Sequence, residues 1–527
     1  MTQPHPRGEH VGNDQREARI IDLDSEDGEV GPGALSIPGP SRAQLLIGFV
    51  VVAAAVAVAF GPLGTGHGSA GKSSAPTTGP QRATYAPAPT ESPALGGWPV
   101  SVDPQYNQTV SVGPDGTVYI GHQPGLDALG RPRSGWLALP DGTVAEPCAY
   151  GSDGTIYGFT LAHDGTTNIW IFGPDGKLRI QEPINVGGYS SVVPGPGGSA
   201  YFVEPQGGDA GKSTIQIVEP YGSGLAIVTP GWVASVMVGE DGTMYLEIQT
   251  PFDSSQYFPG YALRVLSPDG AQVGPDGAQV WRGMALAPDG TLYAWGFDIA
   301  GDGQVVATSQ LAAFDSSGRS KPGWPVAFSG PISVPQFSPD GTVYLINGYS
   351  TLVALGPDGR TRAGWPVMLP AGETAMVEAS NLAAPGAAQS PVVDDSGKLV
   401  FVTVSDLQGP GTVMAFDTGG DLAWSLVLVE NPTGIVEPQL TLGAIFVRLN
   451  SGEGRIYVIL ENEIAAIAEN GDPVPGWPLL APASFAGWLG LWPAPDGGLV
   501  VSVGQASGIG SYLAQIYRVG PNNMTAR

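Results

Sequence analysis

The hexapeptide Pro-Asp-Gly-Thr-Val-Tyr occurs twice in this chain, at residues 114–119 and again at residues 339–344. Altered copies of it end at Tyr157, Tyr245, Tyr293 and Tyr457. An Asp-Gly pair favours a tight turn because glycine adopts positive φ at little cost, and the Thr, Val and Tyr that follow favour a half-buried strand. The hexapeptide therefore predicts a turn followed by a strand, repeated along the chain.

The copies recur at a regular spacing of 38 to 57 residues. Each unit also has a second strand-and-turn signature, clearest at residues 352–359, and several have a Gly-Trp-Pro signature, at residues 323–325, 364–366 and 476–478. Periods of about 40 to 50 residues are typical of propeller blades, and each blade has four antiparallel strands. The residues that end the first signature are Tyr119, Tyr157, Tyr201, Tyr245, Tyr293, Tyr344, Phe401, Tyr457 and Val501.

The two ends of the repeat region indicate how the ring closes. Gly-Trp-Pro-Val stands at residues 97–100, before the first complete unit, whereas the last unit ends at residues 516–519 without an outer strand of its own. We therefore expect the N-terminal strand to complete the C-terminal blade, which removes open sheet edges. The sequence predicts an all-β fold, a β-propeller of eight or nine four-stranded blades.

The units resemble the pyrroloquinoline-quinone-type (PQQ-like) β-propeller repeat of bacterial quinoproteins and of noncatalytic outer-membrane assembly lipoproteins. The resemblance covers about residues 96–520. It rests on Ala354, Gly359 and Trp365, and again on Ala415, Gly419 and Trp424. It implies the fold, since fold does not determine chemistry. Many alcohol-oxidising members have a disulfide between adjacent cysteines, which this chain cannot form with Cys148 alone. We therefore predict the noncatalytic branch and no cofactor.

The charge balance excludes one class of partner. The chain has 527 residues, with 22 basic and 48 acidic ones, which gives a net charge of −26. Nucleic-acid binding needs a basic footprint that neutralises phosphates, so we expect no nucleic-acid partner. Much of the acidity comes from Asp at turn positions, where these residues are favoured for structural reasons.

Residues 43–63 carry no charge and are about as long as a bilayer-spanning helix. We predict one transmembrane helix here, and a cleaved signal peptide is the rival interpretation. Residues 1–42 are predicted to be a disordered cytoplasmic tail, 64–95 a Pro/Ser/Thr/Gly/Ala-rich linker, 96–520 the propeller and 521–527 a short tail. This organisation is typical of a single-pass protein of the cell membrane with its large domain on the extracytoplasmic side.

Candidate chemical groups are few. The five His residues have no metal-site spacing, and Cys148 has no activating neighbour in sequence. Asp298 and Asp302 lie in a partial match to a calcium-binding loop and are the weak metal candidates. A carbohydrate-active propeller would need two facing carboxylates. The acids that follow strands inside the units and could reach one rim are Glu204, Glu247, Asp253 and Asp298.

Residues 251–261 concentrate four aromatic side chains in one long connection between strands. These are Phe252, Tyr257, Phe258 and Tyr261, which are the candidates for ligand contact. We predict a membrane-anchored extracytoplasmic propeller that acts as a protein- or glycan-binding scaffold of the cell envelope. The alternative is a propeller enzyme, either a polysaccharide hydrolase or lyase or a quinone-dependent oxidoreductase.

Overall fold

The computed structural model describes residues 19–22, 81–82 and most of 97–520. The gaps within the last range are 103–108, 163–165, 189–190, 206–211, 250–260, 275–279, 282, 300–305, 349, 370–389, 405–411, 429–442, 450, 460–462, 476, 481–486 and 508–509.

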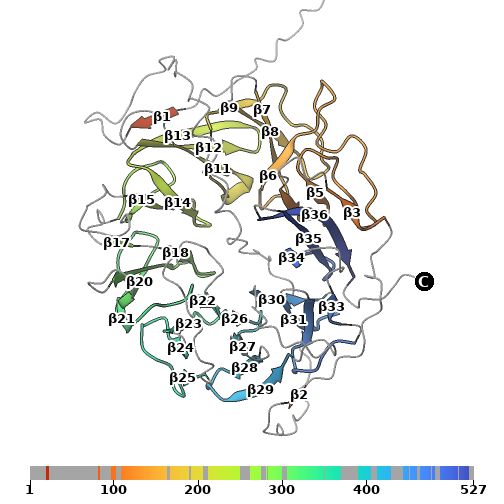
Figure 1. The fold of residues 1–527 in the computed structure, drawn as a ribbon. Coiled ribbons are helices and arrows are strands. Elements are labelled where there is room, and N and C mark those ends of the chain that lie inside the picture. Colours follow the sequence, from red (N-terminus) through yellow and green to blue (C-terminus); the bar gives the residue numbers. More distant parts are fainter. Residues whose placement is uncertain are drawn as a thin grey trace, which may run out of the picture.

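Eight four-stranded antiparallel sheets form the blades of a ring, so the predicted β-propeller is confirmed. In Figure 1 the first strand of each blade lies nearest the centre and the fourth lies outside. The first four blades along the chain are β6–β9 (Glu146–Tyr150, Ile156–Leu161, Thr167–Phe172, Ile184–Val186), β10–β13 (Ser191–Pro194, Ala200–Pro205, Lys212–Glu219, Gly222–Pro230), β14–β17 (Val233–Val238, Met244–Gln249, Tyr261–Leu266, Val280–Trp281) and β18–β21 (Gly283–Leu286, Leu292–Ile299, Val306–Phe314, Val326–Ser329). The other four are β22–β25 (Gln336–Phe337, Val343–Asn347, Thr351–Leu355, Val367–Met368), β26–β29 (Val392–Val393, Leu399–Val404, Thr412–Asp417, Leu422–Val427), β30–β33 (Gly443–Arg448, Gly454–Ile459, Glu463–Ala468, Leu479–Leu480) and β34–β36 (Gly487–Pro493, Leu499–Ser507, Gly510–Val519) with β3 (Val100–Ser101).

The ring closes as the sequence predicts, because β3 is the outer strand of the last blade. Val100 pairs with Ile516 in antiparallel register. Trp98 is buried, and its Nε1 donates a hydrogen bond to the carbonyl oxygen of Ala128, 3.3 Å away in the first repeat. The Nη1 of Arg518 donates to the carbonyl oxygen of Gly116 at 3.2 Å, across 402 residues of chain. These contacts join the two ends of the repeat region.

The first repeat is incomplete. It contributes a two-stranded sheet, β4 (Val110–Val112) and β5 (Val118–Ile120). Its third position is reduced to isolated bridges that pair Leu126 with Val118 and with Pro132. The sheet contacts β34 on one side and β6 on the other. The predicted eight or nine four-stranded blades are therefore eight such blades and a ninth repeat with two strands.

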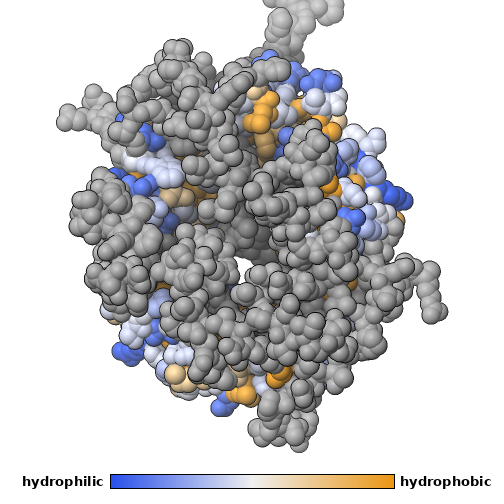
Figure 2. Space-filling view, in the orientation of Figure 1, coloured by the Kyte–Doolittle hydropathy of each residue, from blue (hydrophilic) through white to orange (hydrophobic). Residues whose placement is uncertain are grey.

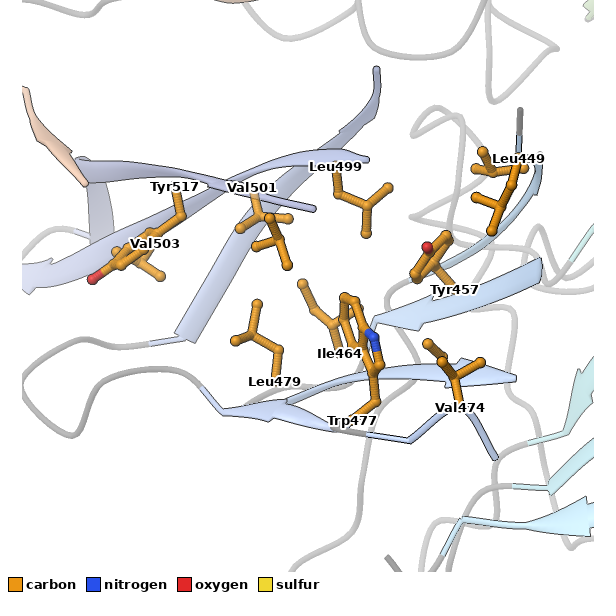
Figure 3. Close-up of a cluster of buried hydrophobic side chains, with 13 residues drawn as sticks. Leu449, Tyr457, Ile464, Val474, Trp477, Leu479, Leu499, Val501, Val503 and Tyr517 are labelled. Atoms are coloured by element: carbon orange, nitrogen blue, oxygen red, sulfur yellow. The ribbon is translucent and has the colours of Figure 1, made fainter. Parts of the chain in front are cut away.

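Neighbouring blades are held together by large apolar side chains from both sheets. Figure 3 shows the cluster between the β30–β33 blade and the β34–β36 blade, where Trp477 lies against Leu479 and Leu499. The rings of Tyr457 and Trp477 are 5.3 Å apart, and both side chains are almost fully buried. Burial of such rings in the spaces between blades is the main stabilising contribution that a repeat cannot obtain alone.

The Gly-Trp-Pro signature also joins one blade to the next. Trp365 donates a hydrogen bond from Nε1 to the carbonyl oxygen of Thr418, at 3.1 Å, on the following blade. Gly364 has a φ of +86°, and a Cβ on it would overlap the carbonyl oxygen of Gly419. Trp324 donates in the same way to Pro357 at 3.0 Å. In these two copies the glycine allows the close approach of two backbones and the tryptophan supplies the hydrogen bond. In the copy at 476–478, Nε1 of Trp477 has no partner among the described residues.

Two further strands come from the region before the propeller. β1 (Arg19–Asp22) pairs in parallel with β13, and β2 (Gln81–Arg82) pairs in parallel with β29. Residues 19–22 belong to the segment predicted as a tail, and 81–82 to the predicted linker. The described residues include no helix long and apolar enough to span a membrane. The segment predicted to do so, 43–63, lies outside the described residues.

Candidate functional site

The two faces of the ring differ in their connections. Most of the Asp-Gly pairs lie in the turns between the first and second strands or between the third and fourth, so we call this face the turn rim. The longer connections leave from the opposite ends of the same strands, on a face that we call the loop rim. Figure 2 shows the ring in space-filling form with an opening near its centre. Because functional loops are carried on rigid scaffolds, the loop rim is the candidate site.

Polar side chains on the turn rim form hydrogen bonds and ion pairs that stabilise the turns. Asp340 accepts a hydrogen bond from the backbone N–H of Thr342 at 3.0 Å and pairs with Arg362 at 2.9 Å. Burial works against ionisation of Asp340, but these hydrogen bonds and the charge of Arg362 hold its pKa below the usual value. The same arrangement joins Asp496 to Arg518 at 2.8 Å.

A cleft of about 350 Å³ lies on the turn rim where the ring closes. It is lined by Asp115, Arg133, Asp496 and Arg518, among others. Arg133 pairs with Asp115, and Arg518 pairs with Asp496, so these charges neutralise each other. The guanidinium group of Arg133 also lies 3.3 Å from the ring centroid of Trp136. The arginines of the cleft are therefore engaged in ion pairs with its own aspartates.

A His–Glu pair occupies the loop rim between the first repeat and the β6–β9 blade. His122 follows β5, and its Nε2 lies 3.2 Å from Oε2 of Glu146 at the start of β6. Thr109 donates a hydrogen bond to the other oxygen of Glu146. The imidazole is 54% exposed, whereas Glu146 is buried. A buried carboxylate that orients an exposed imidazole is an arrangement that can serve general acid–base chemistry.

Two of the predicted rim acids lie near the loop-rim ends of their strands. Burial raises the pKa of Glu204, on β11, to about 7, although the backbone N–H of Gly187 donates a hydrogen bond to its carboxylate. Glu247, on β15, is 7% exposed, and burial raises its pKa to about 7. Its Oε1 has no hydrogen-bond partner among the described residues. Both groups are carboxylic acids whose charged form is disfavoured by desolvation.

These two acids do not face each other. Glu204 lies on the same side of its sheet as Phe202, which packs toward the β6–β9 blade. Glu247 lies on the same side as Tyr245, which packs toward the β18–β21 blade. They therefore enter two different spaces between blades. In a glycosidase the two carboxyl groups flank one glycosidic bond, so Glu204 and Glu247 do not form a glycosidase pair.

The remaining predicted site residues fall mostly outside the described part. Phe252, Tyr257, Phe258, Asp253 and Asp302 lie there, as does the side chain of Asp298. Tyr261 is half-buried at the start of β16, in register with Trp281 on β17. Among the described residues, no group of three or more His, Cys, Asp or Glu side chains could hold a metal ion.

Two large apolar side chains are exposed on the loop rim. Leu161, at the end of β7, is 68% exposed, and Trp232, between β13 and β14, is 46% exposed. Figure 2 shows hydrophobic residues at the surface over the β6–β9 blade. Glu146, Leu161, Glu204 and Trp232 thus come from two consecutive blades and the connection that follows them. We call these four residues with His122 the loop-rim surface; its exposed leucine and tryptophan are suited to contact with another molecule.

Comparisons with known proteins show no family assignment. No protein-family model and no curated protein matches the sequence. Similar solved structures include BamB from Moraxella catarrhalis, with 15% identity, coverage of 70% of this chain and 95% of that one, and a TM-score of 0.37. AztD from Citrobacter koseri has 14% identity, coverage of 71% and 95%, and a TM-score of 0.35.

A quinohemoprotein alcohol dehydrogenase from Pseudomonas putida HK5 has 10% identity, coverage of 71% of this chain and 74% of that one, and a TM-score of 0.36. BamB and this dehydrogenase are PQQ-like β-propellers. No family and no activity follows from similarities at this level. The fold assignment therefore rests on the sheet topology described above.

Proposed function

We propose that this protein is a membrane-anchored β-propeller whose ring lies on the extracytoplasmic side, where it binds a protein or a glycan of the cell envelope and acts as a scaffold. The observation that carries the proposal is the exposure of two large apolar side chains on the loop rim. The loop-rim surface presents Leu161 and Trp232 to solvent, and the turn rim also has exposed side chains of this kind at Leu129 and Tyr221. Exposed apolar and aromatic side chains on a rigid scaffold favour binding.

The proposed anchor is the uncharged segment 43–63, which is long enough to span a bilayer core. An uncleaved anchor at this position places the propeller outside and residues 1–42 inside. This topology would exclude the pairing of residues 19–22 with β13 described above. The linker of residues 64–95 holds the ring away from the bilayer. A cleaved signal peptide would instead release the propeller.

The His122–Glu146 pair favours the alternative, a propeller enzyme. Its exposed imidazole could exchange a proton with a substrate, which is the chemistry that a polysaccharide lyase requires. Against this alternative, Glu204 and Glu247 face different spaces between blades. The His122–Glu146 pair is thus suited to proton transfer. The two facing carboxylates that a glycosidase needs are not found in Glu204 and Glu247, and binding remains the proposed function.

Cysteine labelling in right-side-out membrane vesicles tests the anchor. In a Cys148→Ser background, a membrane-impermeant maleimide should label Leu161→Cys in intact vesicles, because Leu161 is exposed. It should label Ser25→Cys only after permeabilisation. Both cysteines should remain with the membrane after a high-salt wash. Labelling of both positions in intact vesicles, or recovery of the protein in the soluble fraction, would contradict the anchor.

A further inference from the structure

The outer strands of the blades fall into two groups by length. In six of the eight four-stranded blades the outer strand has two to four residues, namely β9, β17, β21, β25, β33 and β3. β13 has nine residues and β29 has six. Short outer strands limit the number of unpaired backbone groups at a sheet edge, which is a known protection against unwanted pairing. β13 is therefore the longest outer strand of the described blades.

The composition of β13 adds no other protection. Residues 222–230 contain no charged side chain, and the only proline is Pro230 at the end of the strand. Charge and proline are the usual devices that prevent an edge from accepting another strand. Exposed aromatic residues stand at both ends of the strand, since Tyr221 is 80% exposed and Trp232 is 46% exposed. Such side chains are typical contact anchors.

The edge of β13 does accept a further strand in the structure. β1 pairs with it in parallel, from Arg19 opposite Leu225 to Asp22 opposite Val228. The other long outer strand, β29, accepts β2 in parallel at Leu426 and Val427. The two blades with long outer strands are thus the two that carry a fifth strand. In the described blades, only the long outer strands pair with an additional strand.

Membrane topology decides which strand can occupy this edge. If residues 43–63 span the membrane, residues 19–22 and β13 lie on opposite sides of it and cannot pair. The edge of β13 is then free in the anchored protein. This step depends on the proposed function. Glu219 is exposed beside the start of β13, at the end where the N-terminus of a parallel peptide would lie.

We propose that the outer edge of β13 binds an extended peptide segment of a partner protein of the cell envelope, which adds to the β10–β13 blade as a parallel fifth strand. The backbone of Leu225–Val228 pairs with the peptide, as it does with β1. Tyr221 and Trp232 contact its two ends, and Glu219 favours a basic residue near its N-terminus. Recognition is of the β-augmentation type, in which main-chain hydrogen bonds supply affinity and flanking pockets supply specificity.

A synthetic peptide of residues 15–26 provides the probe, because it contains the strand that pairs with β13. The receptor is the full chain in detergent micelles with Ile20→Pro and Ile21→Pro, which keep its own segment off the edge. We expect saturable binding by fluorescence anisotropy and at least tenfold slower amide exchange at 225–228. A peptide with the same two prolines should not bind. Tyr221→Ala with Trp232→Ala should weaken binding at least tenfold.

Three results would overturn this proposal: no binding, equal binding of the proline peptide, or equal protection of the β21 edge at Val326–Ser329, which is the internal control. A fourth result concerns which strand occupies the edge of β13. In right-side-out vesicles, amide exchange in β13 should be the same for the native chain and for the Ile20→Pro, Ile21→Pro variant. Faster exchange in the variant would show that the chain's own segment occupies the edge. The micelle measurement does not depend on the anchor, so failure of peptide binding and failure of anchoring are distinguishable.

Discussion

Replacing Gly364 with alanine is expected to destabilise the propeller by about 4 kcal/mol or more, which is exceptional for the addition of a single methyl group. The new Cβ would overlap the carbonyl oxygen of Gly419 on the next blade, and Gly364 has a φ of +86° that alanine adopts at a cost. The obstacle is backbone, so no side-chain rotation relieves it. Soluble yield and the thermal midpoint in differential scanning calorimetry would measure the loss.

Gly290→Ala provides the matched control. Gly290 has a φ of +80°, but nothing lies within 4 Å of the Cβ that alanine would add. Its substitution should cost only the backbone preference, about 1–2 kcal/mol. Equal destabilisation by the two variants would show that close approach of neighbouring blades at Gly-Trp-Pro does not contribute, and would contradict the interpretation of this signature.

Glu247→Gln is expected to stabilise the protein at pH 8 and to leave it unchanged near pH 4.5. Burial raises the pKa of Glu247 to about 7, well above the ordinary value of a glutamic acid near 4.5. Between these two pH values the folded state holds more protons than the unfolded chain. The free energy of unfolding therefore falls as the pH rises from about 4.5 to about 7, and the loss is on the order of 3 kcal/mol. Glutamine mimics the protonated acid at every pH.

Calorimetric midpoints at pH 4.5, 6 and 8 would test this dependence. The difference between the variant and the native chain should grow with pH and level off above about pH 7. Glu240→Gln, an exposed position beside the same blade, should show no such trend. A Glu247→Gln protein that is less stable than the native chain at pH 8 would mean that the ionised carboxylate is stabilised in the fold.

Local patterns in the sequence were sufficient to predict the architecture. The Asp-Gly turns, the strand residues after them and the Gly-Trp-Pro at 97–100 are all short-range signals, and they predicted the four-stranded blades and the closing strand β3. The incomplete first repeat was not predicted. Between β5 and Pro132 the chain contains Gly121, Gly125 and Gly130, and a regular third strand is replaced by isolated bridges at Leu126.

The candidate site was only partly predictable. Glu204 and Glu247 were identified because each follows a strand, but the space that each enters depends on side-chain alternation. Glu204 stands three residues after its repeat's tyrosine, and Glu247 stands two residues after its own. One residue of offset places them on opposite faces of their sheets. The His122–Glu146 pair was missed because the two residues meet only when the first repeat packs on the β6–β9 blade.

The most direct test of the proposed binding role is site-specific photo-crosslinking in the native host. A benzophenone side chain is introduced at Leu161 on the loop rim, or at Leu129 on the turn rim, where the exposed fraction is 46%. Benzophenone reacts with C–H bonds of proteins and of glycans, so either partner would be captured and distinguished by protease or glycosidase digestion. The account predicts one discrete adduct from Leu161 and none from Leu129. The same adducts from both positions, or none from Leu161, would contradict it.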